Sequence, residues 1–168
     1  MARLGEEVII EWLNCDGYFT IRSVKIGSSE IDVLAIKPLA GGGHFCRHIE
    51  VQLSPHPMSY IAAGSMGAKK KTDAELGAAV KDWVDKKFNR PKVVKLRKSL
   101  CESEWTKELV LWNVKYESEV REIERLGIKV WRLRAILEDM EKYNRGRHYS
   151  AAGRDLLALI IDIRKELP

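Results

Sequence analysis

Two acidic side chains, Asp32 and Glu50, have the types and spacing to do chemistry. They lie in two runs of alternating residues, at 30–36 and 46–53, that predict strands joined by a glycine-rich loop. A hairpin symmetric about Gly41 places Asp32 directly opposite Glu50, where side chains are about 5 Å apart and like charges are destabilising. A divalent cation bound by hard oxygen ligands would offset this repulsion, so we expect Mg²⁺ or Mn²⁺ as the cofactor.

A solvated pair of acids is the alternative interpretation of Asp32 and Glu50. Both would then line a wet face of the sheet without binding anything. Against this, both acids are embedded in runs of Ile, Val and Leu that predict burial on both faces. An unpaired carboxylate costs free energy in such surroundings. We therefore favour the metal site.

A third acid, Glu6, belongs to a predicted helix at 2–15. Apolar residues of this helix share one arc: Leu4, Val8, Ile9, Trp12 and Leu13. Glu6 lies at the border of this arc, whereas Glu7 and Glu11 fall near the opposite, wet side. Glu6 is therefore the acid of this helix that can reach the sheet.

Three segments occur in the order and spacing of a known nuclease family: GEEVIIEWLNCDGYF at 5–19, EIDVLAI at 30–36 and HIEVQ at 48–52. In these segments the chain resembles the PD-(D/E)xK nuclease superfamily, in particular archaeal Holliday junction resolvases and restriction-type endonucleases. The resemblance covers about the first third of the chain, and beyond it only the succession of elements. It implies a restriction-endonuclease-like fold and a metal-dependent DNA endonuclease, either structure-specific or restriction-type.

The resemblance also implies a role for each site residue. Asp32 and Glu50 would be metal ligands, with the carbonyl of Val51 as a third, and Glu6 would support the ion or its waters. Gln52 stands where the family usually has lysine. Glutamine can hydrogen-bond a water or a phosphate oxygen but cannot take a proton from it at neutral pH. Gln52 would then orient the nucleophile, and catalysis would depend on the metal.

The glutamine at the lysine position leaves two other functions open. One is a non-catalytic nucleic-acid-binding or assembly module with a degenerate nuclease fold. The other is a nuclease of the same fold that acts on RNA.

Positive charge is concentrated outside the acidic first part of the chain. The net charge is +5, although residues 1–53 hold five basic and seven acidic residues. Affinity for nucleic acid comes largely from contacts to backbone phosphates. The candidate phosphate contacts are Lys69, Lys70, Lys71, Lys92, Lys95, Arg97, Lys98, Arg145 and Arg147. The alternatives are a solvated helix face for the basic stretch at 86–98 and a surface linker for the loop with the three consecutive lysines.

The remaining patterns complete an α/β fold. They predict helices at 72–88, 117–126, 134–144 and 151–167, a short basic helix that ends at Leu100, and strands at 18–26, 108–114 and 128–133. We expect one domain with a mixed sheet of about five strands, helices on both faces, a nuclease core at 1–135 and a C-terminal helical extension at 136–168. The last helix has too many apolar residues for one narrow stripe, which predicts a homodimer.

The composition predicts a cytoplasmic protein that does not enter a membrane. No apolar run approaches the roughly 20 residues that span a bilayer. Acidic residues interrupt the N-terminal segment, which therefore lacks the layout of a signal peptide. The three cysteines are far apart in the sequence, so we expect reduced thiols.

Overall fold

The computed structural model describes residues 2–27, 29–54, 61–62 and 72–143. The elements follow one another as α1 (Ala2–Cys15), β1 (Phe19–Ile26), β2 (Ser29–Pro38), β3 (His44–Gln52), α2 (Asp73–Val84), η1 (Asp85–Asn89), α3 (Pro91–Leu100), β4 (Trp105–Leu111), α4 (Glu117–Arg125), β5 (Lys129–Arg132) and α5 (Leu133–Tyr143). No helix in these ranges is long and apolar enough to cross a membrane. The predicted helix at 151–167, from which we expected a homodimer, lies outside the described residues.

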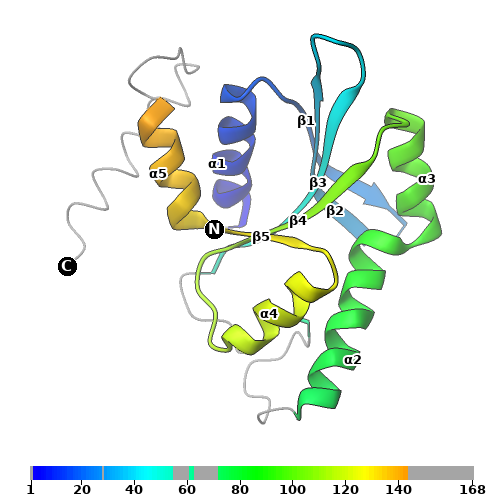
Figure 1. The fold of residues 1–168 in the computed structure, drawn as a ribbon, viewed down its shortest axis with the longest axis vertical. Helices are drawn as coiled ribbons and strands as arrows, with labels where there is room; N and C mark the ends of the chain where they lie inside the picture. The colour runs from blue at the N-terminus through cyan, green and yellow to red at the C-terminus, as the bar shows by residue number, and fades with distance from the viewer. Residues whose placement is uncertain (1, 28, 55–60, 63–71, 144–168) are drawn as a thin grey trace.

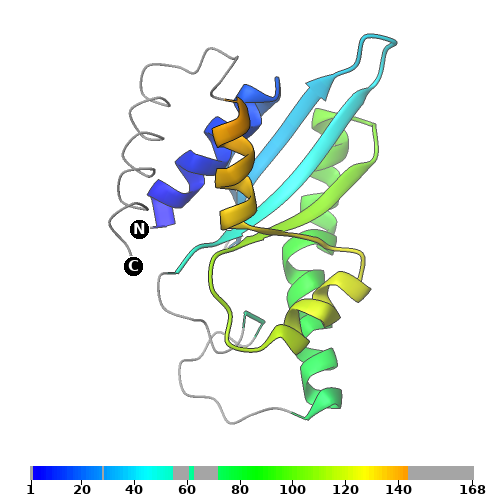
Figure 2. The ribbon, with the colours of Figure 1, turned by 60° about the vertical axis from the view of Figure 1, so that its left-hand side comes forward.

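A five-stranded mixed sheet forms the centre of the molecule, as predicted. Its strands are ordered β1-β2-β3-β4-β5, and the β1–β2 and β2–β3 pairs are antiparallel. The β3–β4 and β4–β5 pairs are parallel. The sheet lies between α1 and α5 on one side and α2, α3 and α4 on the other (Figures 1 and 2). The α/β class and the two helical layers are therefore confirmed.

The central hairpin has the predicted register. Val33 pairs with Ile49 and Pro38 pairs with His44, which is the symmetry about Gly41 expected from the sequence. In the turn, Gly42 donates a backbone hydrogen bond to Leu39 at 3.0 Å. Gly42 has a φ of +88°, a conformation that glycine adopts without steric cost. The turn thus fixes which residues of β2 and β3 face one another.

The β1–β2 ladder is interrupted beside Asp32. Arg22 pairs with Val33, and pairing resumes at Val24, so Ser23 and Asp32 are skipped. Ser23 has a φ of +52°, a left-handed conformation that is uncommon for residues other than glycine. Irregular strand positions often re-aim a side chain next to a functional site. Asp32 therefore lies where the sheet departs from regular pairing.

The first hydrophobic cluster packs α1 and α5 against one face of the sheet. Its buried members are Val8, Ile9, Trp12, Leu13, Val33, Ala35, Ile49, Val110, Ile136 and Met140. Full burial of an aliphatic side chain of this size contributes about 1.5–3 kcal/mol. Because α5 supplies two members, the first part of the predicted C-terminal extension shares the core of the sheet.

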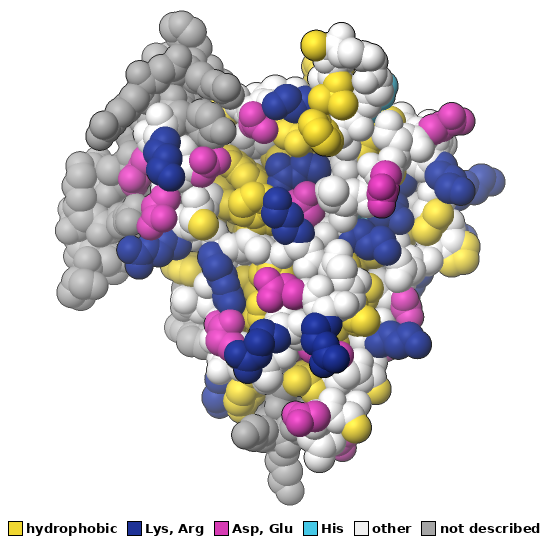
Figure 3. All heavy atoms as spheres, in the orientation of Figure 1, with side chains coloured by type: hydrophobic (Ala, Val, Ile, Leu, Met, Phe, Trp, Pro, Cys, Tyr) yellow, Lys and Arg dark blue, Asp and Glu magenta, His cyan; other side chains and the backbone are white. Residues whose placement is uncertain are grey.

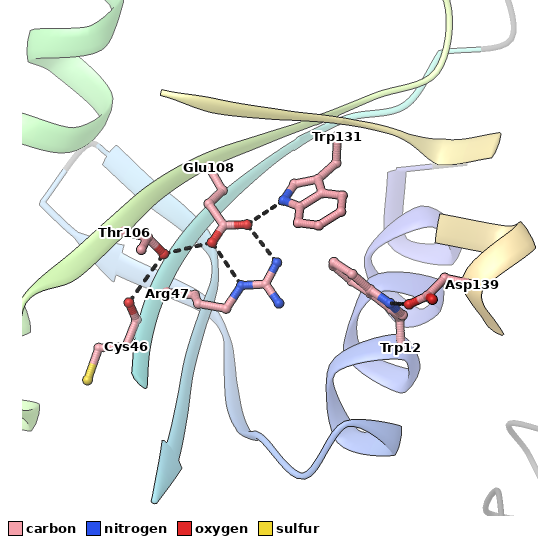
Figure 4. Close-up of polar contacts among 7 residues, drawn as sticks. All are labelled: Trp12, Cys46, Arg47, Thr106, Glu108, Trp131 and Asp139. Carbon is pink, nitrogen blue, oxygen red and sulfur yellow. Dashed lines mark hydrogen bonds and ion pairs between the residues drawn. The ribbon is translucent and has the colours of Figure 1, made fainter. Parts of the chain in front are cut away.

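A buried ion pair lies on the same face of the sheet (Figure 4). Arg47 donates to both carboxylate oxygens of Glu108, at 2.9 Å from Nε and 2.6 Å from Nη2. Thr106 and Trp131 also donate to Glu108, at 2.7 and 2.5 Å. The Arg47 guanidinium also lies 4.7 Å from the centroid of a Trp12 ring. With its acceptors filled, this cluster acts as part of the core.

The opposite face is covered by α2, η1, α3 and α4. Thr72 and Glu75 form the predicted capping box at the start of α2. The buried stripe of α2 continues into η1 as Leu76, Val80, Trp83, Val84 and Phe88. η1 is a π-helical turn, a type that is frequent at functional sites, and it ends before Pro91 at the start of α3. This turn carries Lys87 over the sheet.

The fourth strand differs in position from its prediction at 108–114. β4 begins earlier, at Trp105, because Trp105 pairs with Cys46 and the next residues of β4 pair with the residues that follow Cys46 in β3. It ends at Leu111, where pairing with both β3 and β5 stops. Trp112 is 41% exposed. The apolar run in the sequence therefore did not predict the ends of β4, because these depend on where the neighbouring strands offer hydrogen-bond partners.

Candidate active site

Asp32 and Glu50 lie together where β2 and β3 separate. The regular ladder ends at the Val33–Ile49 pair, one position before the two acids. The Asp32 carboxylate instead accepts a hydrogen bond from the Val51 backbone N–H at 2.7 Å. Asp32 is half-buried, whereas Glu50 is 0% exposed. The structure therefore brings the two predicted acids together at the edge of the core.

Burial makes the ionised forms of both acids costly. Burial, followed by the charge of Glu50, raises the pKa of Asp32 to about 6, although the Val51 hydrogen bond opposes this. Burial raises the pKa of Glu50 to about 7, although the positive charge of Lys87 opposes this. A further cation beside these oxygens would favour the ionised forms.

Lys87 supplies one positive charge at this position. Its ammonium forms an ion pair with Oε2 of Glu50. Burial lowers the pKa of Lys87, but the charges of Glu50 and Asp32 outweigh burial, and the net shift is upward. We did not predict a role for Lys87 from the sequence. Lys87 follows Trp83 and Val84 by four and three positions, which places it beside the apolar stripe of the helix. This spacing is the sequence signal that could have identified Lys87 as a residue facing the sheet.

His48 and Arg97 form a buried second layer behind Glu50. The Nε2 atom of His48 lies 3.2 Å from Oε1 of Glu50, and Nδ1 of His48 lies 3.5 Å from Nη1 of Arg97. Burial, followed by the charge of Arg97, lowers the pKa of His48 to about 3. The imidazole is therefore neutral at physiological pH.

Arg97 corrects one of our sequence predictions. We expected it on a basic surface in contact with phosphate, but its side chain is 6% exposed. It lies one helical turn after the buried Val93 and faces the sheet. Its Nη2 atom donates to the Phe88 carbonyl at 3.0 Å. Arg97 is thus an internal residue and does not lie on a phosphate-binding surface.

Glu6 approaches Asp32 from α1. Ser23 donates a hydrogen bond to Glu6 at 3.4 Å, and burial, followed by the charge of Asp32, raises the pKa of Glu6. The neighbouring Gly5 permits this approach, because a Cβ added there would lie 2.5 Å from a methyl carbon of Leu53 after β3. The helical acid therefore lies on the Asp32 side of the site.

The pair of carboxylates suits a magnesium ion that keeps most of its waters. Within the described ranges, no three His, Cys, Asp or Glu side chains are grouped so as to hold a metal ion. Mg²⁺ commonly takes one or two protein carboxylates and leaves its other positions to water and phosphate. Because each carboxylate oxygen has two lone pairs, Glu50 keeps acceptor sites beyond its contacts to His48 and Lys87. Asp32 and Glu50 fit this mode, and ligation by Val51 or Glu6 stays a prediction.

The other predicted residues are placed as follows. Gln52 is half-buried at the end of β3, two residues after Glu50 and therefore on the same side of the strand. On α3, Lys92, Lys95 and Lys98 are exposed. Basic side chains project from the side of the molecule that α3 forms (right in Figure 3). The predicted contacts Lys69, Lys70, Lys71, Arg145 and Arg147 lie outside the described residues.

The site combines groups suited to hydrolysis at phosphorus. β2 and β3 supply two carboxylates as hard oxygen ligands, β3 also supplies the amide of Gln52, and η1 supplies the ammonium of Lys87. The basic helix α3 follows η1 directly. Metal-assisted hydrolysis uses oxygen ligands for the ion and cations for the developing negative charge. The chain matches no protein-family model, no curated protein and no solved structure.

Proposed function

We propose that this protein is a metal-dependent endonuclease with a restriction-endonuclease-like fold that hydrolyses phosphodiester bonds in DNA. The observation that carries the proposal is the convergence of Asp32, Glu50 and Lys87. The first two stand next to Val33 and Ile49, the last pair of the predicted hairpin register, and the third pairs with Glu50 from a helix. The exposed lysines of α3 support a polyanionic substrate.

In this proposal Asp32 and Glu50 hold Mg²⁺ or Mn²⁺. When bound, the ion lowers the pKa of water and stabilises charge on the phosphate. Lys87 supplies the positive charge that the family obtains from the lysine at the position of Gln52. Its ammonium favours the ionised form of Glu50 and can donate a hydrogen bond to a phosphate oxygen. Gln52 orients the attacking water through its side-chain amide.

A non-catalytic nucleic-acid-binding module is the second candidate. Two observations favour it: glutamine replaces the family lysine, and Lys87 already forms an ion pair with Glu50. In that case the ion pair of Lys87 and Glu50 holds η1 against the sheet, and the basic helix α3 binds nucleic acid. The proposal of a module and the proposal of an enzyme predict the same binding but opposite cleavage.

Cleavage of supercoiled plasmid, a four-way junction and RNA, each with Mg²⁺, Mn²⁺ or chelator, tests the proposal. We expect the wild type to cut DNA only with metal, and Asp32→Ala to bind DNA without cutting it. The exposed Glu124 of α4 provides the matched control, Glu124→Gln, which should cut like the wild type. Binding without cleavage under every metal condition would establish the module instead.

The basic surface of α3 has its own test in the same preparations. Replacing Lys92, Lys95 and Lys98 together with alanine should weaken DNA binding and lower the salt dependence of the binding constant. Each lost phosphate contact reduces the slope of log K against log salt by about 0.9. An unchanged slope would remove this helix from the interface.

A further inference from the structure

We propose that Arg97 and His48 are positioning residues that hold Glu50 and the turn carrying Lys87 in one hydrogen-bonded frame. This inference rests on the proposed function and extends it, because the roles proposed above belong to Asp32, Glu50, Lys87 and Gln52. His48 belongs to a strand and Arg97 to a helix that we had already predicted from the sequence. The frame joins β3, η1 and α3.

The first arm of the frame fixes the orientation of Glu50. A guanidinium has only donors, so Nδ1 of His48 accepts the hydrogen bond from Arg97 at 3.5 Å. The proton of the neutral imidazole is therefore on Nε2, which donates to Oε1 of Glu50 at 3.2 Å. Both His48 and Glu50 are 0% exposed, so water does not compete for this contact.

The second arm fixes the turn that carries Lys87. Nη2 of Arg97 donates to the carbonyl of Phe88, the residue that follows Lys87 in η1. Lys87 in turn contacts the second oxygen of Glu50. One planar guanidinium thereby contacts His48, which holds one oxygen of the carboxylate, and the backbone of the residue that follows Lys87, which holds the other.

Stability alone gives a poor account of this arginine. Among the residues that the structure describes, no carboxylate lies within ion-pair distance of Arg97. Its guanidinium contacts an imidazole and a carbonyl. The buried Arg47 on the other face has the carboxylate of Glu108 instead. A buried charge without a counter-ion costs free energy that an apolar residue of similar size avoids. The fork geometry of Arg97 supplies what an apolar residue cannot, two donors in fixed directions.

The test compares two variants of His48 with one of Arg97. His48→Gln keeps a donor near the position of Nε2, whereas His48→Leu removes it. Arg97→Lys keeps the charge but cannot contact His48 and Phe88 together. Trp12→Phe is the matched control, since it removes a 2.9 Å hydrogen bond to Asp139 on the other face of the sheet.

Two measurements report on the frame: Mn²⁺ affinity by electron paramagnetic resonance, and kcat and KM for plasmid cleavage. We expect His48→Leu and Arg97→Lys to weaken Mn²⁺ binding by on the order of 10- to 100-fold and to lower kcat at unchanged KM. His48→Gln should stay within a few-fold of the wild type, as should Trp12→Phe. Wild-type values in both His48→Leu and Arg97→Lys would overturn the inference.

A ¹⁵N spectrum of the His48 ring separates failure of the frame from failure of the proposed function. The frame requires Nε2 to carry the proton in the wild type, and Arg97→Lys to change the tautomer population. This result supports the frame even if the wild type neither binds Mn²⁺ nor cuts DNA, an outcome that refutes only the nuclease. A ring protonated on Nδ1 overturns the frame whatever the metal data show.

Discussion

Replacing Asp32 with asparagine should stabilise the metal-free protein at alkaline pH. The change removes a charge that is half-buried beside Glu50 but keeps an oxygen that can accept the Val51 N–H. Most substitutions at a buried position destabilise a protein, so a gain in stability is a sharp expectation.

The magnitude follows from the pKa of Asp32. It rises from an ordinary value of 3.8 to about 6, and one pKa unit corresponds to about 1.36 kcal/mol, which gives a destabilisation of about 3 kcal/mol by the ionised form. A neutral amide makes a weaker bond to the Val51 N–H, at a cost of about 1 kcal/mol. We therefore expect Asp32→Asn to be more stable by about 2 kcal/mol at pH 8.

The sign of the pH dependence is fixed by the direction of the shift. Below about pH 4, Asp32 is largely protonated in both folded and unfolded chains, so its pKa shift contributes little. Between about pH 4 and pH 6 the unfolded chain loses this proton first, and the wild type becomes progressively less stable relative to Asp32→Asn. Above that range the difference is constant.

Thermal unfolding in chelator at pH 4, 6 and 8, with Glu124→Gln as control, measures this difference. For a chain of this length, about 2 kcal/mol corresponds to a rise in Tm of roughly 4–8 °C. Addition of Mg²⁺ at pH 8 should raise the Tm of the wild type and leave that of Asp32→Asn nearly unchanged. Equal stability of the two proteins at pH 8, or an equal response to Mg²⁺, would refute the reasoning.

Three further predictions concern Lys87, Gln52 and the Arg47–Glu108 pair. Lys87→Met should abolish cleavage, and above pH 7, where Glu50 loses its counter-ion, it should destabilise the fold by less than the about 3–5 kcal/mol of a fully buried pair, because Lys87 is 29% exposed. Plasmid cleavage and denaturant unfolding check this, and an active variant would contradict it. Gln52→Lys should retain or raise cleavage activity, so a folded but inactive protein would count against the role given to Gln52. Arg47→Met should destabilise the protein by about 3–5 kcal/mol, because the carboxylate of Glu108 is left buried without a counter-ion. The double variant Arg47→Met/Glu108→Gln should recover part of that loss, as measured by denaturant unfolding.

The local features of the fold could be predicted from the sequence. Alternation over 30–36 and 46–53, with glycines between, was enough for the hairpin and its register, because both depend on residues close in the chain. The capping box at Thr72 is also a local signal, and it was correct. The five-stranded mixed sheet followed from the succession of elements.

The residues around Glu50 could be predicted only in part, because they come from distant segments. Lys87 was counted with a basic stretch, and its contact depends on how α2 and η1 cross β3. Arg97 belongs to the same stretch, yet its spacing of four from Val93 turns it inward. Net charge over a segment does not distinguish a solvated lysine from a buried arginine, whereas position relative to the apolar stripe does. The left-handed Ser23 had no sequence signal that we could identify.

The origin of Lys87 on a helix couples assembly of the site to completion of the fold. A chain that has formed only the β2–β3 hairpin already has its two acids beside the last pair of the ladder but lacks the ammonium, which arrives when η1 docks on the sheet. An unfinished or partly unfolded chain therefore holds an incomplete set of groups. Under the proposed function, a damaged or nascent copy of this protein would be harmless to the nucleic acids around it.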